Sequence, residues 1–262
     1  MITRADGPVP ATQFVNHSWQ ALGNYSLARD GFELVEHRID QDAVESLRLA
    51  MAQLPSRHRG GVRNLLRDSE TIAALASSES LKSLADAALG ADAFPVRGLF
   101  FDKSPDANWK VPWHQDTAIA VAERIEMPGF IGWSVKDDVP HVHPPTGILE
   151  RMVALRIHLD DCGRDNGTLR VLPGSHRDGK LDDAAIDHWR QTTAEVSCCA
   201  ASGDVLLMRT LLLHASSPVK SPSRRRVIHL EYACETLPGG LKWFELADPC
   251  LIPSAQEFQP LT

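Results

Sequence analysis

The stretch MVALRIHLDDCGRDNGTLRVLPGS, residues 152–175, contains two short apolar runs. Turn-forming residues lie between the two runs, and no helical segment does. Residues 152–159 and 168–172 read as strands, because each run is brief, apolar and bounded by residues that favour turns. The pair Asn166-Gly167 between them is typical of a hairpin turn. A Pro-Gly-Ser turn then closes the second run. The stretch therefore indicates β-structure built from short, closely spaced strands.

Similar short apolar runs lie on both sides of this stretch, at residues 94–102, 204–209 and 225–233. Turn residues bound these runs too, so each reads as a strand. The strands follow a helical region and do not alternate with helices in the βαβ manner. Helices followed by a series of strands favour an all-β barrel or sandwich with the helices packed outside it.

The helical region occupies the chain before residue 94. Residues 41–54 place apolar side chains at roughly helical spacing, and residues 69–89 are rich in Ala, Leu, Ser and Glu. Gly90 follows the second segment, where a glycine is suited to end a helix. A shorter helix is expected at residues 182–193, between two of the later strands.

The composition excludes several classes of function. The chain has 262 residues, of which 43% are apolar and 23% charged, values that are ordinary for a globular protein. The net charge of −7 argues against a nucleic-acid partner, and no apolar run approaches the roughly 18 to 20 residues of a membrane span. The first residues form no apolar leader, and the five cysteines contain no CxxC pattern. We expect a cytoplasmic protein with no nucleic-acid or membrane partner.

The most informative motif for chemistry is Trp113-His114-Gln115-Asp116. Side chains two residues apart on a strand project from the same face, so His114 and Asp116 can converge on one ion. His214, which we expect at the end of a later strand, offers a third ligand. Two histidines and one carboxylate form the facial triad of non-haem Fe(II) sites, which leaves coordination positions open.

Ordinary structural roles compete with this interpretation. His-x-Asp is a three-residue pattern that also arises by chance, and a histidine in an apolar strand is more often a core or surface residue. His141-Val142-His143 has similar spacing but precedes two prolines, and we interpret it as a loop feature rather than a second metal site. His158 and His229 lie inside expected strands and are interpreted as core or pocket-wall residues.

A candidate carboxylate-binding residue follows the third histidine. Arg225 opens an expected strand, and its planar guanidinium matches the two oxygens of a carboxylate such as that of 2-oxoglutarate. We expect this strand to pair with the one that ends at His214, which would bring Arg225 near the metal. Ser216 is either a hydrogen-bond donor to the same carboxylate or a simple loop hydroxyl. Arg224 and Arg226 are expected in solvent.

Together these motifs resemble the phytanoyl-CoA dioxygenase family, closely over residues 94–234 and more loosely over the helical N-terminal part. The segments that carry the resemblance, in the family's order, are FFDK (100–103), WHQD (113–116), LDD (159–161), NGTL (166–169), PGSHR (173–177), GDV (203–205) and the chain from His214 to Arg225. Members of this family are Fe(II)- and 2-oxoglutarate-dependent oxygenases. The resemblance implies a mainly β fold: a double-stranded β-helix core, jelly-roll and cupin-like, with flanking N-terminal helices.

The resemblance also implies roles for single residues. The implied iron ligands are His114, Asp116 and His214. Arg225 matches the arginine that binds 2-oxoglutarate, Ser216 matches the hydroxyl beside it, and Lys103 falls where relatives place another polar contact. Halogenating relatives have Ala or Gly in place of the carboxylate, so Asp116 favours hydroxylation.

The implied reaction couples the decarboxylation of 2-oxoglutarate to succinate and CO2, with dioxygen as oxidant, to hydroxylation of a small-molecule substrate. The candidate substrate contacts are Trp113, Gln115, Trp133 and Lys136, with Asn108 and Trp109 nearby. A plain packing or surface role is open for each of them. An aromatic and partly cationic pocket mouth suits a small acidic or amphipathic metabolite.

Residues 118–150 form a long segment that contains four prolines and directly follows two of the proposed ligands. Loops of this length inside compact domains are usually functional or disordered. We expect an irregular, mobile segment that serves as a lid or wall over the pocket.

We expect one domain over residues 1–262, with a helical layer to about residue 93, a β-helix core at 94–234 and a C-terminal extension at 235–262. Two other functions stay open at this point. A non-catalytic, metal-binding sensor on the same barrel would lack a ligand or the arginine. A cupin-type metalloenzyme would recruit a further histidine, from among His141, His143 and His158.

Overall fold

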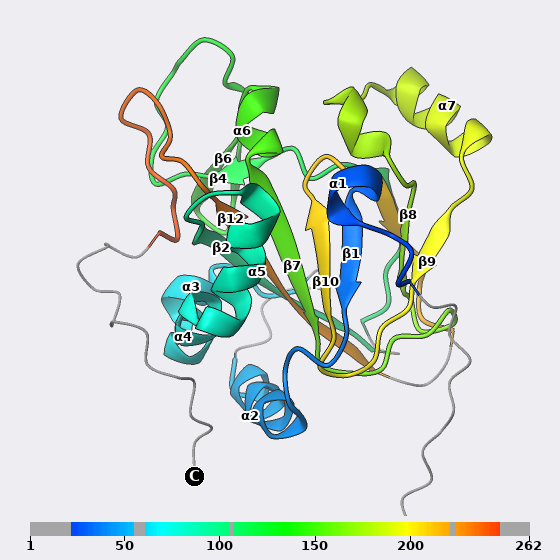
Figure 1. Ribbon diagram of the computed structural model, residues 1–262. Helices are drawn as coiled ribbons and strands as arrows, with labels where there is room; N and C mark the ends of the chain where they lie inside the picture. The colour runs from blue at the N-terminus through cyan, green and yellow to red at the C-terminus, as the bar shows by residue number, and fades with distance from the viewer. Residues whose placement is uncertain (1–21, 55–60, 105–106, 221–223, 247–262) are drawn as a thin grey trace, which may run out of the picture.

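Two antiparallel sheets form the framework of the protein in a computed structural model, which describes residues 22–54, 61–104, 107–220 and 224–246 (Figure 1). The larger sheet consists, in spatial order, of β1 (Phe32–Val35), β10 (Val205–Arg209), β7 (Met152–His158), β12 (Arg225–Ala233) and β2 (Phe94–Lys103). The smaller sheet consists, in spatial order, of β3 (Val111–His114), β11 (His214–Ser216), β8 (Leu169–Val171) and β9 (Val196–Cys198).

Apolar side chains from both sheets pack together between them. Ala154 and Met208 of the larger sheet share a buried cluster with Leu169 and Val171 of the smaller sheet. Such packing of two antiparallel sheets is the architecture of a double-stranded β-helix. The predicted mainly β fold with a double-stranded β-helix core is confirmed.

Helices cover the outer face of the larger sheet, namely α2 (Gln41–Ala52), α3 (Leu65–Asp68), α4 (Glu70–Ser77) and α5 (Glu79–Leu89). Leu155 and Ile157 of β7, together with Ile228 and Leu230 of β12, pack against these helices in one buried cluster. Side chains alternate along a strand, so the odd-numbered residues of β12 point the other way, into the space between the sheets. This alternation turns Arg225 towards the interior.

The N-terminal region differs from the sequence prediction in two ways. Residues 69–89 form two helices rather than one, because Ser78 adopts an extended backbone (ψ 146°) and its hydroxyl donates to the Leu75 carbonyl at 2.6 Å. Gly90 ends α5 with a φ of 65°, as expected. The region also contains a strand, β1, which was predicted as part of a helical layer and pairs with β10 at the edge of the larger sheet. The short helix α1 (Leu27–Asp30) precedes it.

Residues 118–150 are folded, so the prediction of an irregular segment was wrong. β4 (Ile119–Ala120), β6 (Val139–His143) and β5 (Ile131–Lys136) form a third sheet, in that spatial order, and α6 (Thr146–Glu150) follows. Asp137 and Asp138 join β5 to β6 with φ values of 49° and 62°. Left-handed values at both central residues are those of a tight hairpin turn, and Asp tolerates them better than most residues.

The predicted late helix is present as α7 (Asp183–Thr192), which lies beyond one end of β8 and β9 (Figure 1). A 3-10 turn, η1 (Ser175–Asp178), precedes it. No helix in the described part of the chain has the length and apolar character needed to cross a bilayer. The single-domain organisation stays a prediction, and residues 1–21 and 247–262 of it lie outside the described residues.

Candidate active site

Three potential metal ligands meet where β3 and β11 pair. His114 is the last residue of β3 and His214 the first of β11, and the two lie opposite each other in the register. The backbone N–H of Asp116 donates to the Thr210 carbonyl at 2.9 Å, which fixes the chain just beyond β3. One ligand atom from each of the three side chains lies within 4.8 Å of the others. Among the described residues, this is the one group of three or more His, Cys, Asp or Glu side chains close enough to hold a metal.

Both imidazoles present the same nitrogen to the shared space. Nδ1 of His114 lies 2.9 Å from the Pro112 carbonyl, and Nδ1 of His214 lies 2.9 Å from the Leu212 carbonyl. A carbonyl oxygen can only accept, so each neutral ring carries its proton on Nδ1 and keeps a lone pair on Nε2. The Asp116 carboxylate lies 3.5 Å from Nε2 of each ring. The three donor atoms thus face one another in the form that binds a cation.

Burial and mutual charge set the protonation of this group. Burial lowers the pKa of His214 to about 4 and keeps its ring neutral at physiological pH. Burial also acts to lower the pKa of His114, but the hydrogen bond and negative charge of Asp116 outweigh it and raise that pKa. Burial alone would raise the pKa of Asp116, yet the charges of the neighbouring histidines hold it far below its usual range. Asp116 is therefore ionised at neutral pH.

A second group of polar residues lies where β2 ends and its partner β12 begins. Lys103 and Arg225 are opposite each other in the register of these strands. Lys103 is 0% exposed, and its Nζ donates to Ser216 Oγ at 2.8 Å and to the Ser217 carbonyl at 3.0 Å. Burial, followed by the charge of Arg225, lowers the pKa of Lys103 to about 7. Such a buried amine becomes fully charged when an anion binds beside it.

Arg225 is also buried, at 3% exposure, and is incompletely paired. Its Nη1 donates to the Gly167 carbonyl at 2.6 Å, whereas its buried Nε has no hydrogen-bond partner. An unpaired buried guanidinium N–H is costly unless a ligand accepts from it. The arrangement of Arg225, Lys103 and Ser216 therefore suits a carboxylate.

The strand pairing that positions Arg225 differs from the predicted pairing. β12 does not pair with β11, which begins at His214; it pairs with β2 and β7 in the opposite sheet. His214 also begins its strand rather than ending one. Arg225 approaches the histidines because the two sheets face each other, not because their strands are neighbours.

The residues on either side of Arg225 point outward, as strand alternation predicts. Arg224 forms an ion pair with Asp102 of β2. Arg226 forms an ion pair with Asp160 at 2.7 Å. Both are therefore held at the surface by carboxylates rather than left in solvent.

One cavity of about 340 Å³ joins the two groups. Its lining includes His114, Asp116 and His214 together with Lys103, Ser216 and Arg225. Strand β2 supplies alternate residues to the wall, which are Arg97, Leu99, Phe101 and Lys103. Its volume lies in the range of small-molecule sites.

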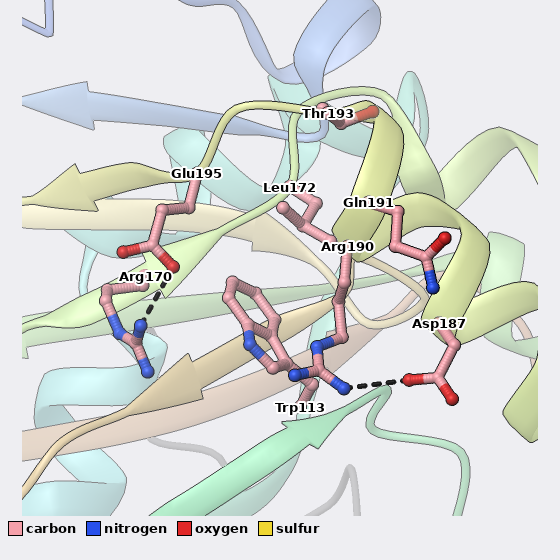
Figure 2. Close-up of a pocket in the computed structure, with 8 residues that line it drawn as sticks. All are labelled: Trp113, Arg170, Leu172, Asp187, Arg190, Gln191, Thr193 and Glu195. Carbon is pink, nitrogen blue, oxygen red and sulfur yellow. Dashed lines mark hydrogen bonds and ion pairs between the residues drawn. The ribbon is translucent and has the colours of Figure 1, made fainter.

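Trp113, a predicted substrate contact, does not line this cavity. Figure 2 shows its ring in a different pocket, of about 480 Å³, with Arg170 of β8 and Arg190 of α7 beside it. The Arg170 guanidinium lies 5.3 Å from the centre of the ring. His114 follows Trp113 on the strand and therefore points the other way. The placement does not support substrate contact by Trp113.

The other predicted substrate contacts lie in different settings. Gln115 lines the cavity, but its side chain is occupied: it donates to the carbonyls of Gly179 and Leu211 and accepts from the Leu181 N–H. These bonds make Gln115 a structural clamp. Trp133 packs against the apolar cluster of the third sheet and is not among the cavity's lining residues.

Lys136, in contrast, lines the cavity from the end of β5. Trp109 also lines it, with Lys103 Nζ 5.2 Å from its ring centre. Asn108 is paired with the backbone of Val219 through both its amide nitrogen and its oxygen. Lys136 is thus the predicted contact whose position best suits a substrate role.

Sequence reasoning missed several charged residues of the cavity wall: Arg63, Arg97, Arg156 and Glu231. Strand alternation could have indicated the last three, because residues an even number of positions apart on a strand face the same side. Arg97 lies on the strand of Lys103, Arg156 on that of His158 and Glu231 on that of Arg225, each at an even separation. Arg63 lies in no strand that the sequence predicted, and no pattern marked it. His229 lines the cavity, as its interpretation as a pocket-wall residue predicts, while His158 is buried.

Two histidines and one carboxylate inside a double-stranded β-helix define a class: cupin-like proteins with a facial-triad metal site. The model of the phytanoyl-CoA dioxygenase (PhyH) family matches residues 27–227, and the chain belongs to this family.

Several known proteins are similar to this chain. The dioxygenase cnsJ of Penicillium expansum is 36% identical over 84 residues, which are 32% of this chain and only 24% of that protein. The crystal structure of AviO1 from Streptomyces viridochromogenes Tue57 is similar with a TM-score of 0.58 and 26% identity, over 88% of this chain and 95% of that one. EctD from S. alaskensis, crystallised with 2-oxoglutarate and 5-hydroxyectoine, has a TM-score of 0.62 and 20% identity over 79% and 73% of the two chains. The likeness to EctD concerns the fold.

Proposed function

We propose that this protein is an Fe(II)- and 2-oxoglutarate-dependent dioxygenase that hydroxylates a small molecule. The observation that carries the proposal is the cavity itself, which joins a cluster of two histidines and a carboxylate to a buried, incompletely paired arginine. Family membership and the dioxygenase name of a relative agree with it.

The donor set of His114, Asp116 and His214 fits Fe(II). Imidazole nitrogens suit iron, and one carboxylate supplies the negative charge that two neutral rings lack. The hydrogen bonds from each Nδ1 to a backbone carbonyl hold the rings in the orientation in which Nε2 faces the metal. Because the ligand set includes the carboxylate of Asp116, hydroxylation is favoured over halogenation.

The group of Arg225, Lys103 and Ser216 fits 2-oxoglutarate. Arg225 offers its unpaired Nε and a charged planar fork to the distal carboxylate. Lys103 adds a second positive charge, and Ser216 a hydroxyl 2.8 Å from Lys103 Nζ. When bound, iron and 2-oxoglutarate supply the activation of dioxygen, with succinate and CO2 as products. The chain's own residues bind and orient the reactants and keep water away from them.

The alternative functions lack support from the described residues. A cupin-type site needs a further histidine, and neither His141, His143 nor His158 belongs to the metal-ligating group. A non-catalytic relative is expected to lack a ligand or the arginine, and all four side chains are present in the cavity wall.

Succinate formation tests the proposal. Purified protein with Fe(II), 2-oxoglutarate and dioxygen is expected to release succinate, slowly even without a substrate, and the His214→Ala variant is expected to release none. Lack of succinate from an iron-loaded wild-type protein across a substrate panel would contradict the proposed function.

A further inference from the structure

Three cationic side chains line the same cavity, and neither the metal assignment nor the 2-oxoglutarate assignment uses them. Arg63 precedes α3, Arg97 lies on β2, and Lys136 ends β5 of the third sheet. They come from three separate parts of the chain, and the fold brings them to one wall. We call Arg63, Arg97 and Lys136 the cationic wall.

The cationic wall lies at the opposite end of the cavity from Arg225. Arg97 and Lys103 are six residues apart on β2 and face the same side, which separates their Cα atoms by about 20 Å. Arg97 Nη1 lies 3.4 Å from the Ala118 carbonyl, two residues beyond Asp116. The proposed metal ligands therefore lie between Arg225 and the cationic wall.

The charge of the cavity is unbalanced. Six of its lining residues are Lys or Arg, and two are Asp or Glu. With Asp137, which pairs with Arg63 from outside the lining, an excess of three positive charges remains when Lys103 is protonated. Fe(II) and 2-oxoglutarate carry equal and opposite charges, so binding both leaves that excess in place. A further anion is needed to bring the cavity close to neutrality.

Existing ion pairs account for only part of the cationic wall. Arg97 lies 3.1 Å from Glu231, a carboxylate that His229 Nε2 also approaches at 3.4 Å. Arg63 lies 3.0 Å from Asp137. Within the described part of the chain, the side chain of Lys136 makes no hydrogen bond or ion pair. Its pKa is lowered first by burial and then by the charges of Arg97 and Arg63, which outweigh the opposite effect of Asp116 and Glu231.

A solvated surface cluster is the ordinary explanation for grouped charges, but burial argues against it here. The side chain of Arg97 is 11% exposed and that of Arg63 is 33% exposed. Taking guanidinium groups out of water is costly unless they are paired. Of the three residues, Lys136 alone is exposed, and it lines the same cavity.

Building on the oxygenase function proposed above, we propose that the cationic wall binds an anionic group of the primary substrate, a carboxylate or a phosphate. The anion anchors one end of the substrate so that a neighbouring carbon faces the metal ligands. The cavity of about 340 Å³ must also hold 2-oxoglutarate, so the substrate is a small organic acid or phosphate ester.

Binding in the absence of oxygen tests this proposal without turnover. Wild-type protein with Fe(II) and saturating 2-oxoglutarate is heated in the presence of a panel of small carboxylic acids and phosphate monoesters. Each acid is matched with its amide and each phosphate ester with its alcohol. At least one anion is expected to raise the melting temperature while its neutral counterpart does not. The acid and ester arms identify which anionic group the wall prefers.

Variants then assign the binding to the cationic wall. Lys136→Ala, at the exposed end of a hairpin, and Arg63→Ala are expected to weaken binding of that anion at least tenfold, through loss of a charge-assisted contact. Lys242→Ala removes an exposed lysine outside the cavity and is the matched control, expected to bind as wild type does.

Two outcomes would overturn the proposal: no anion stabilises the wild-type protein more than its neutral counterpart, or Lys136→Ala binds the anion as tightly as wild type. Failure of the oxygenase assignment is distinguishable from these outcomes, because it appears independently as the absence of succinate formation. Repeating the titration without Fe(II) and 2-oxoglutarate shows whether the anion binds independently of them.

Discussion

Replacement of Arg225 by Ala removes the side chain that we propose holds the distal carboxylate of 2-oxoglutarate. In the protein, this guanidinium is 3% exposed, bonded to the Gly167 carbonyl at 2.6 Å, and left with an unpaired Nε. The substitution deletes a charge from a site that water hardly reaches. The loss therefore falls on the binding of the anion and on the hydrogen bond to the Gly167 carbonyl.

The magnitude follows from the strength of charge-assisted hydrogen bonds. Such a bond contributes roughly 1.5 to 3 kcal/mol. Since about 1.4 kcal/mol corresponds to a factor of ten, loss of one bond should weaken 2-oxoglutarate binding about 10- to 150-fold. Loss of a bidentate pair should exceed this. Arg225→Lys keeps the charge but not the planar fork, so its effect should be intermediate.

The assay is the apparent KM for 2-oxoglutarate in succinate formation. Arg226→Ala is the matched control, because Arg226 lies next in the chain but pairs with Asp160 on the outer face. Its KM should stay within about twofold of wild type. If Arg226→Ala raises the KM as much as Arg225→Ala does, or if neither changes it, the reasoning from strand parity and the co-substrate assignment is refuted.

The remaining predictions concern the metal group, a buried carboxyl and a structural amide. Replacing His114, Asp116 or His214 by Ala should weaken Fe(II) binding in calorimetry and abolish succinate formation, and an active variant would remove that residue from the ligand set. Burial raises the pKa of Glu245 from 4.5 to about 7, so the folded state holds its proton more tightly and stability should fall as pH rises through this interval. In urea unfolding, the stability of wild type relative to Glu245→Gln should fall by about 2 kcal/mol between pH 5 and 8, and a constant difference would contradict this. Gln115→Leu should lower the unfolding free energy by about 1 to 3 kcal/mol for each backbone group left unpaired, whereas unchanged stability would disprove the clamp role.

The strand framework of this protein was predictable because its signals are local. Short apolar runs with turn residues at their ends marked β2, β7, β10 and β12, and strand parity separated Arg225 from its two neighbours. The hairpin of β5 and β6 was missed because four prolines outweighed the turn signal of Asp137-Asp138. Pro140 lies within β6 all the same.

Strand pairing and the cavity wall were not predictable in the same way. Strand β12 was expected beside the strand of His214, yet it lies in the opposite sheet, because pairing depends on contacts between distant segments. Trp113 precedes a proposed ligand in sequence but points to the other face of β3, towards α7 (Figure 2). Arg63 reaches the cavity only through the packing of its segment against β2, where Val62 pairs with Phe100.

The central claim is that one cavity brings a metal held by His114, Asp116 and His214 together with 2-oxoglutarate held by Arg225. Anaerobic absorption spectroscopy measures this most directly, because 2-oxoglutarate that chelates Fe(II) produces a visible charge-transfer band. We predict that the band appears in wild-type protein only when both Fe(II) and 2-oxoglutarate are present. It should be absent from His214→Ala and require much higher 2-oxoglutarate in Arg225→Ala. A wild-type protein that binds Fe(II) yet gives no band, or a band unchanged in His214→Ala, would contradict the account.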